Sequence, residues 1–188
     1  MISAVLQTVA NELNEFFKLK FGISDERVVI SNLVNQDGSA AVKDENRIIL
    51  SLALIQEEKM GAYKASGSIS PGGVKPIAIN LFLLFSASFN EKLNIDATKF
   101  ISAVIAFFQN KPVFNQQNSP GLTDGMEKLS FEIFNMSIQE QSNLWSTIGA
   151  KYLPSILYKV RVITVDEKAL MPDAVDIVGI SRGYSKVE

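Results

Sequence analysis

The sequence of 188 residues contains no histidine and no cysteine. These two absences exclude zinc sites built on cysteine or histidine, thiol nucleophiles, c-type haem attachment and every Ser-His-Asp triad. A chain without thiols is compatible with reducing and oxidising surroundings alike, so the cysteine count indicates no compartment. An excess of positive charge is missing too, because 18 Lys and Arg stand against 20 Asp and Glu. The net charge of −2 therefore provides no bulk attraction to nucleic acid or to an anionic membrane.

Long hydrophobic runs are also missing from the sequence. The N-terminal segment has no basic start, and Glu12 and Glu15 lie within its apolar pattern, unlike a signal peptide. The longest apolar run, from Ile77 to Phe89, contains Asn80 and is too short to cross a bilayer. We therefore expect a soluble chain with no direct membrane insertion.

The apolar content is ample for one folded domain. Of all residues 47% are apolar, so a chain of this length buries a core without a disulfide or metal. Apolar residues recur at helical spacing in three places, which predicts helices over 2–19, 90–109 and 138–148. Gly22 and Gly149 are stop signals for the first and third helices, and Asn90 is the expected N-cap of the second. Ser137 and Glu140 fit the S-x-x-E capping box at the start of the third.

Five segments have the composition of strands. Continuous or alternating apolar residues predict strands over 27–33, 47–56, 77–89, 129–133 and 155–166. Both faces of the third strand are apolar, so we expect a central strand covered on two sides. The first two strands are separated by a long connection that contains the turn pair Asp37-Gly38. Residues 57–76 and 110–127 are rich in glycine, proline and polar residues, and we predict loops there.

The order of these elements predicts the fold class. Helices and strands alternate over residues 1–166, which indicates a single α/β (α+β) domain with a mixed β-sheet of about five strands packed with helices. Residues 167–188 contain Pro172, Gly179 and Gly183 and only one short apolar piece. We interpret them as an extended C-terminal arm.

The sequence contains no complete phosphate-binding or nucleophile motif. The segment from Gly67 to Gly72 has the first spacing of a Walker A loop, but Gly73 and Val74 follow where lysine and a hydroxyl residue are needed. Pro71 also removes a main-chain amide that could contact a phosphate. S-x-x-K does not occur, which excludes the usual Ser-Lys nucleophile. D-x-D does not occur either. We expect no bound nucleotide.

Acidic residues form two close sets around the C-terminal arm. These are Asp166-Glu167 and Asp173 with Asp176, and we interpret both as solvated charge rather than a metal site. The sequence therefore predicts no catalytic, cofactor-binding or metal-binding residue. Two catalytic carboxylates brought together by the fold remain an open alternative at this point.

Aromatic and basic residues lie close together near the end of the predicted domain. The set consists of Trp145, Lys151, Tyr152, Tyr158, Lys159 and Arg161. Such interleaving is compatible with nucleic-acid stacking. The favoured interpretation is structural: Trp145 anchors a helix to the core, and Lys159 and Arg161 line one face of a strand. We expect no nucleic-acid partner.

Several long segments of the sequence resemble one known family. They are MISAVLQTVANELNEFF, NRIILSLALIQEE, PIAINLFLLFSASF, the helix ending AVIAFFQNKPVF, and LWSTIGAKYLPSILYKVRVITVD. Together they cover most of residues 1–166. The most specific parts are FFQNKPVF and the block W-S-x-I-G-A-x-Y-x-P-S-I-L-Y-K-V-R. In these segments the sequence is similar to the cap, or tail-terminator, proteins of contractile injection systems. These systems are phage-tail-like particles that drive a rigid tube through a contracting sheath.

The resemblance implies a structural subunit that is not an enzyme. It implies a tail-terminator-like fold and a six-fold ring that ends tube and sheath polymerisation at the end distal to the baseplate. The partners implied are further copies of the chain, the inner tube protein, the sheath protein and other cap or plug subunits. Assembly is expected in the cytoplasm, as part of a particle that is either released from the cell or membrane-anchored. We also expect the arm to dock on a neighbouring cap or sheath subunit, with packing on its own domain as the alternative.

The sequence alone leaves three other functions as alternatives. A small-molecule-binding or regulatory α/β module would be favoured by a large apolar pocket. A hydrolase would need two buried carboxylates that face one cleft. An adaptor within the cap complex, paralogous to the terminal cap, would share the same domain.

Overall fold

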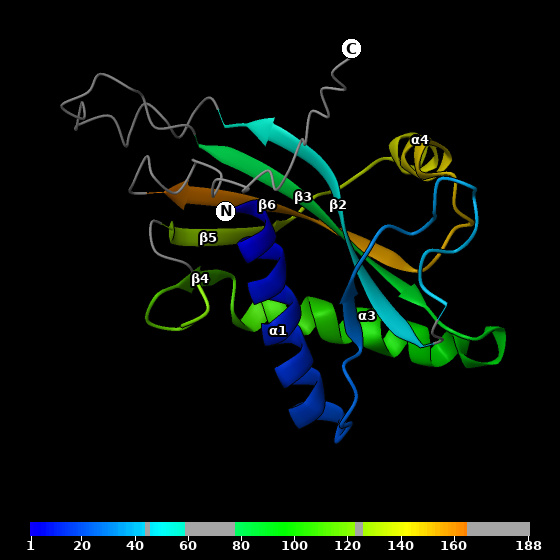
Figure 1. The fold of residues 1–188 in the computed structure, drawn as a ribbon, viewed down its shortest axis with the longest axis horizontal. Helices are drawn as coiled ribbons and strands as arrows, with labels where there is room; N and C mark the ends of the chain where they lie inside the picture. The colour runs from blue at the N-terminus through cyan, green and yellow to red at the C-terminus, as the bar shows by residue number, and fades with distance from the viewer. Residues whose placement is uncertain (44–45, 59–77, 123–125, 165–188) are drawn as a thin grey trace, which may run out of the picture.

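The structure is a computed structural model that describes residues 1–43, 46–58, 78–122 and 126–164. Figure 1 shows the helices and strands of this part of the chain. In chain order they are α1 (Ile2–Phe21), β1 (Val28–Ile30), β2 (Arg47–Glu57), β3 (Ile79–Ser88), the 3₁₀ helix η1 (Glu91–Leu93), α3 (Asn94–Asn110), β4 (Val113–Asn115), β5 (Met126–Ile133), α4 (Ile138–Ile148) and β6 (Ser155–Thr164).

The strands form one mixed sheet in the order β1-β2-β3-β6-β5-β4. β1 pairs with β2 in parallel, and all other neighbouring strands are antiparallel. The predicted α/β (α+β) class is confirmed, with six strands instead of about five. The additional strand is β4, which lies inside the predicted loop 110–127 and pairs with β5 from Lys128 to Ser130.

β3 is the strand that the sequence predicts to be covered on both faces. Its residues from Asn80 to Ala87 are all buried, and it lies between β2 and β6 in the sheet. Leu81, Leu83 and Phe85 point to one face, and Phe82 and Leu84 point to the other. The prediction of a central strand is confirmed.

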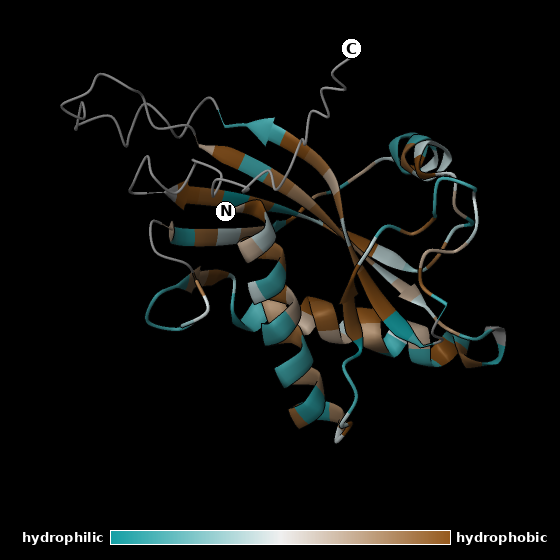
Figure 2. Ribbon diagram, in the orientation of Figure 1, coloured by the Kyte–Doolittle hydropathy of each residue, from teal (hydrophilic) through white to brown (hydrophobic). Residues whose placement is uncertain are grey.

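The helices α1 and α3 cover one face of the sheet (Figure 1). α1 buries one side against the strands, and Figure 2 shows the corresponding alternation of hydrophobic and hydrophilic bands along it. Aromatic rings fill the space between α3 and the sheet. Phe108 lies 4.5 Å from Phe131 and 4.6 Å from Tyr158, measured between ring centroids. This face contains the larger of the two apolar cores.

α4 covers part of the opposite face through one large side chain. Trp145 is the only buried residue of α4, with 6% of its surface exposed. It joins a smaller apolar cluster with Leu33, Ile49, Phe82, Leu84 and Leu157. The predicted role of Trp145 as a helix anchor is confirmed.

The helix ends follow the local signals with one exception. Gly22 and Gly149 adopt left-handed backbone angles with φ of 63° and 73°, and each ends its helix as predicted. Ser137 and Glu140 form the capping box. The exception is Asn90, whose side chain caps η1 by accepting a hydrogen bond from the Lys92 N–H, so that α3 begins only at Asn94.

Two predicted segments fall largely outside the described residues. Of the loop predicted over 57–76, the structure describes Glu57, which ends β2, and Glu58. The arm over 167–188 lies wholly outside them, as do Asp166-Glu167, Asp173 and Asp176.

Candidate functional site

The segment FFQNKPVF forms the corner between α3 and β4. Phe107, Phe108 and Phe114 are buried in the larger core. The Lys111 ammonium lies 4.7 Å from the centre of the Phe114 ring and 2.8 Å from a carboxylate oxygen of Glu12 in α1. The most distinctive part of the sequence therefore ties α3, β4 and α1 together.

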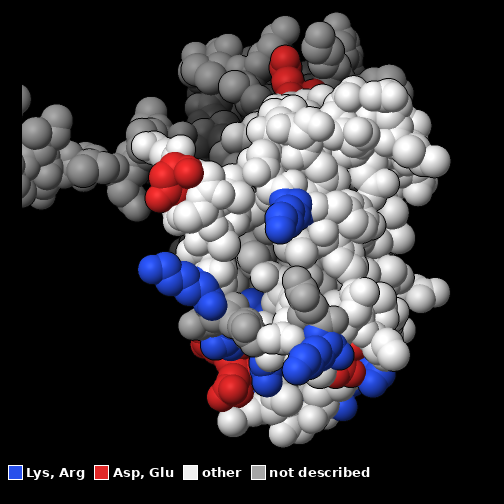
Figure 3. All heavy atoms as spheres, turned by 90° about the vertical axis from the view of Figure 1, so that its right-hand side faces the viewer, with Lys and Arg blue, Asp and Glu red and all other residues white. Residues whose placement is uncertain are grey.

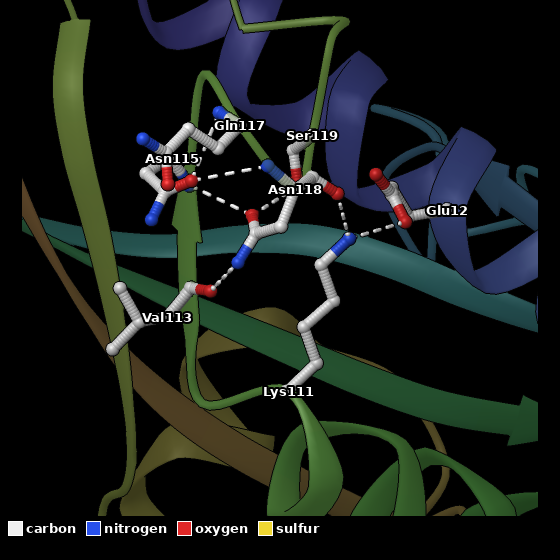
Figure 4. Close-up of polar contacts among 7 residues, drawn as sticks. All are labelled: Glu12, Lys111, Val113, Asn115, Gln117, Asn118 and Ser119. Carbon is white, nitrogen blue, oxygen red and sulfur yellow. Dashed lines mark hydrogen bonds and ion pairs between the residues drawn. The ribbon is translucent and has the colours of Figure 1, made fainter.

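The loop after β4 closes this corner through a network of asparagine side chains (Figure 4). The Asn118 side chain accepts a hydrogen bond from the Asn115 N–H at 2.9 Å and donates one to the Val113 carbonyl at 2.9 Å. The Asn115 side chain accepts from the N–H groups of Gln117 and Asn118, both at 3.0 Å. The Lys111 ammonium donates to the Asn118 carbonyl at 2.6 Å. We interpret this network as structural, since the side-chain oxygens of both asparagines accept main-chain N–H groups of this corner and the Asn118 amide donates to a main-chain carbonyl.

The aromatic and basic residues singled out in the sequence do not form one surface. Trp145 and Tyr152 contact each other edge-on with ring centroids 5.3 Å apart, and Tyr152 is 62% exposed. Tyr158 is buried among the aromatic rings of the other face, and this burial raises its pKa to about 12. Lys159 and Arg161 alternate with it and point to the face that carries α4. The stacking platform that nucleic-acid binding requires is therefore not built from these residues.

Glu58 is a buried acidic residue that sequence reasoning missed. Its side chain is 9% exposed, and one of its carboxylate oxygens lies 3.3 Å from Arg161 Nε and 3.6 Å from Lys159 Nζ. The amide of Asn80 donates to the same oxygen at 2.9 Å. The sequence places Glu58 in a polar loop, and its partners come from β3 and β6, so no local signal marks it.

This carboxylate does not form a catalytic acid pair. Glu58 is the only buried acidic residue in the described part of the chain. In that same part no group of three or more His, Cys, Asp or Glu could hold a metal ion. The hydrolase alternative therefore lacks its second carboxylate among these residues.

The surface over α4 and the β1–β2 connection carries little charge. Residues 138–148 contain one charged residue, Glu140, and residues 31–42 contain one, Asp37. Figure 3 views this side of the molecule and shows few charged side chains on its upper part, with one basic side chain near the centre and most of the charges gathered toward the lower edge. Ile138 is 87% exposed here. Depletion of charge and exposed large apolar side chains are typical of the centre of a protein–protein interface.

Two hollows lie beside α4 on this surface. The first, of about 230 Å³, is lined by β2 residues 51–53 and by Leu144, Thr147 and Ile148 of α4. The second, of about 450 Å³, is lined by the β1–β2 connection and by residues 149–151 and 153. Lys151 is the one charged residue in either lining. The first lining also contains the polar residues Asn32, Ser51 and Thr147, and the hydroxyls of Ser51 and Thr147 donate to the main-chain carbonyls of Ser31 and Asn143. Since both linings are otherwise almost uncharged, we interpret the hollows as part of a contact surface for a protein partner.

The part of the chain that the structure describes has no helix that is both long and apolar enough to cross a membrane.

The comparisons with known proteins agree on one group. Residues 4–175 match the family described as the Pvc16 N-terminal domain. No curated protein matches the chain. Among solved structures, the chain is similar to the sheath/tube terminator of PVC, an extracellular contractile injection system, in its extended state. That match has 15% identity and a TM-score of 0.57, and it covers 100% of this chain and 63% of the terminator chain.

The chain is also similar to the tube-terminating cap of the anti-feeding prophage. Here the identity is 15% and the TM-score 0.50, with 95% of this chain and 60% of the cap chain covered. The chain thus spans less than two thirds of the length of either relative. At this identity the two matches establish the fold, while the family match covers most of the sequence. The resemblance seen in the sequence is confirmed: the chain belongs to the Pvc16 N-terminal domain family and has the fold of terminator and cap proteins of contractile injection systems.

Proposed function

We propose that this chain is the structural terminator of a contractile injection system. Six copies form a ring at the end of the tube and sheath distal to the baseplate, and this ring ends their polymerisation. The observation that carries the proposal is the family match over residues 4–175, together with the similarity of the described fold to a sheath/tube terminator. The partners are further copies of the chain, the inner tube protein, the sheath protein and other cap or plug subunits.

The physical task of a terminator explains why two unlike surfaces are needed. Tube and sheath are stacks of rings, so the growing end of each presents an unsatisfied face. A terminator has to match that face on one side and offer no equivalent face on the other. The described domain is asymmetric in this sense, because two helices close one face of its sheet, while α4 and the β1–β2 connection lie over the other. The weakly charged surface over α4 is our candidate for contact with a protein partner.

We propose no catalytic, cofactor-binding or metal-binding residue for this chain. The lack of histidine and cysteine in the sequence and the ion pairs of Glu58 with two basic residues support this assignment. We also propose no nucleic-acid partner and no direct insertion into a membrane. The chain assembles in the cytoplasm into a particle that is then released or membrane-anchored.

The organisation we propose is a terminator domain over residues 1–166 followed by a docking arm over residues 167–188. A chain that ends at Asp166 tests this division. We expect it to fold, with an unfolding transition close to that of the full chain, and to fail to join particles. A truncated chain that still caps particles of normal length would contradict the role of the arm, and one that does not fold would place the arm in the core.

Deleting the gene for this chain in the organism that makes the particle tests the function. We expect tubes and sheaths of irregular length in electron micrographs, and restoration of uniform length when the full chain is supplied again. Particles that keep their normal length and end ring without this chain would contradict the proposal.

A further inference from the structure

β2 is paired along only part of its outer side. It runs over eleven residues and pairs with β3 along this length except at Ala53, where the register shifts, but β1 pairs only with Ile48, Ile49 and Leu50. From Leu52 to Glu57, no strand of the described residues pairs with the side of β2 away from β3. Figure 1 shows β2 continuing well past the end of β1 at this border of the sheet. We call residues 52–57 the open edge.

The open edge carries apolar side chains on both of its faces. Leu54 and Ile55 are each 48% exposed. Their register partners on β3 are Phe82 for Leu54 and Leu81 for Ile55. Phe82 and Leu81 belong to the two opposite cores, so Leu54 and Ile55 point to opposite faces of the sheet. An apolar edge of this length is a template for an added strand, and proteins normally cover or charge such an edge.

The hollow of about 230 Å³ lies at the start of the open edge. Its lining includes Leu52 and Ala53 of β2, together with Leu144 and Ile148 of α4. When a strand adds to a sheet edge, main-chain hydrogen bonds provide affinity and pockets for alternate side chains provide specificity. The open edge offers the main-chain hydrogen-bonding groups, and this hollow offers a pocket for a side chain of the added strand.

The chain leaves the described domain at the same end of the sheet. Val162 of β6 pairs with Ile79 of β3, and Ile79 pairs with Glu57 of β2. Two strand spacings, about 10 Å, therefore separate the end of β6 from the end of the open edge. After Thr164 the sequence continues to residue 188 and includes AVDIVGI at 174–180. This segment is rich in β-branched residues and is about as long as the open edge.

We propose that residues 174–180 of one subunit add as a strand to the open edge of the next subunit in the ring. Residues 165–173, fully extended, span about 30 Å, which is enough to reach a neighbouring subunit. Each subunit then gives one arm and receives one, a head-to-tail contact that closes in a ring. This inference rests on the proposed function, since the ring supplies the neighbour.

The absence of cysteine from the chain permits a direct test. The double variant Leu54→Cys/Ile177→Cys places one thiol near the middle of each segment, so the two meet in either strand direction. Assembled particles are treated with a short bismaleimide and analysed on a denaturing gel. We expect a ladder of covalent multimers up to the hexamer. A link confined to the single chain, or no link at all, would overturn the proposal.

Matched variants make the result specific. Leu19→Cys/Ile177→Cys carries its first thiol on α1, where Leu19 is 88% exposed, and should give no ladder. A mixture of Leu54→Cys chains with Ile177→Cys chains should give linked dimers, because each chain has one thiol. If Leu54→Cys lowers the melting temperature, Gln56→Cys replaces it at the same edge.

Imaging of the distal end distinguishes a failure of the arm exchange from a failure of the terminator function. Particles of the cysteine-free parent are imaged in parallel for a ring at their distal end. A ring without a covalent ladder would overturn the arm exchange alone. A ladder from a chain that is absent from the distal end would overturn the terminator function and leave the exchange standing.

Discussion

The side chain of Asn14 in α1 holds the main chain of Val28 in β1 through both of its polar groups. Its Oδ1 accepts a hydrogen bond from the Val28 N–H at 2.8 Å, and its Nδ2 donates to the Val28 carbonyl at 3.0 Å. The same Oδ1 accepts from the Arg27 N–H at 2.9 Å. Because Asn14 is 5% exposed, this amide fixes the position of the edge strand against the first helix within the core.

Replacing this amide should destabilise the domain. Asn14→Leu leaves the Arg27 and Val28 N–H groups without their acceptor, and we expect a loss of about 2–4 kcal/mol in the free energy of unfolding. Urea unfolding followed by circular dichroism measures the change. Asn11→Ala, three residues earlier on the exposed side of α1, is the control and should change stability by less than about 0.5 kcal/mol. Equal effects of the two variants would contradict the role of Asn14.

Trp145 should be the main attachment of α4. Trp145→Ala removes the one buried side chain of this helix, and we expect a loss of about 3–5 kcal/mol or separation of α4 from the sheet. Since the sequence contains a single tryptophan, fluorescence of the unchanged chain gives a second measure. We expect blue-shifted emission with weak acrylamide quenching. Emission typical of a solvated indole would contradict the buried position.

The ion pair between Lys111 and Glu12 should contribute measurable coupling. Both side chains are about three-quarters buried, so solvent screens them less than a surface pair. A double-mutant cycle with Lys111→Met and Glu12→Gln should give about 1 kcal/mol. The same cycle on Lys99 and Asp96, an equally short but exposed pair, should give about 0.3 kcal/mol. Similar values for both pairs would show that Lys111 acts through packing alone.

Tyr158 should make the stability depend on pH in alkaline solution. Burial raises its pKa to about 12, against about 10 for an ordinary tyrosine. Between these values the unfolded chain has lost a proton that the folded chain retains. The contribution of Tyr158 to the free energy of unfolding is therefore complete below pH 10 and falls from pH 10 to about 12, by about 1.4 kcal/mol per pH unit.

The measurement is a comparison of urea unfolding at pH 9, 10 and 11. Tyr158→Phe should show a shallower decline than the unchanged chain, because it lacks the phenol. Tyr152→Phe removes one phenol hydroxyl from a residue that is 62% exposed, and it is the matched control for the loss of a phenol. Identical slopes for the unchanged chain and Tyr158→Phe would contradict a raised pKa.

Local signals in the sequence were sufficient for most helix and strand positions. The stops at Gly22 and Gly149 and the capping box of Ser137 and Glu140 depend on a few neighbouring residues, and all were predicted. Asn90 carried a correct capping signal, but η1 precedes α3. β4 was missed because its three residues follow Pro112 in a polar segment, and only its pairing with β5 identifies it as a strand.

The candidate surfaces could not be predicted in the same way. The open edge exists because β1 is shorter than β2 and pairs only with residues 48–50, and this register cannot be seen in the two segments separately. The environment of Glu58 depends on side chains from β3 and β6 that are far away in sequence. The family resemblance suggested a partner class, but the surface over α4 became visible only in the folded domain.

The most direct test of the central claim is electron cryomicroscopy of the distal end of the particle, with this chain identified by a tag. The account predicts a six-fold ring of this chain seated on the last layer of tube and sheath. A distal end that lacks the chain, or a terminal ring of another symmetry, would contradict it.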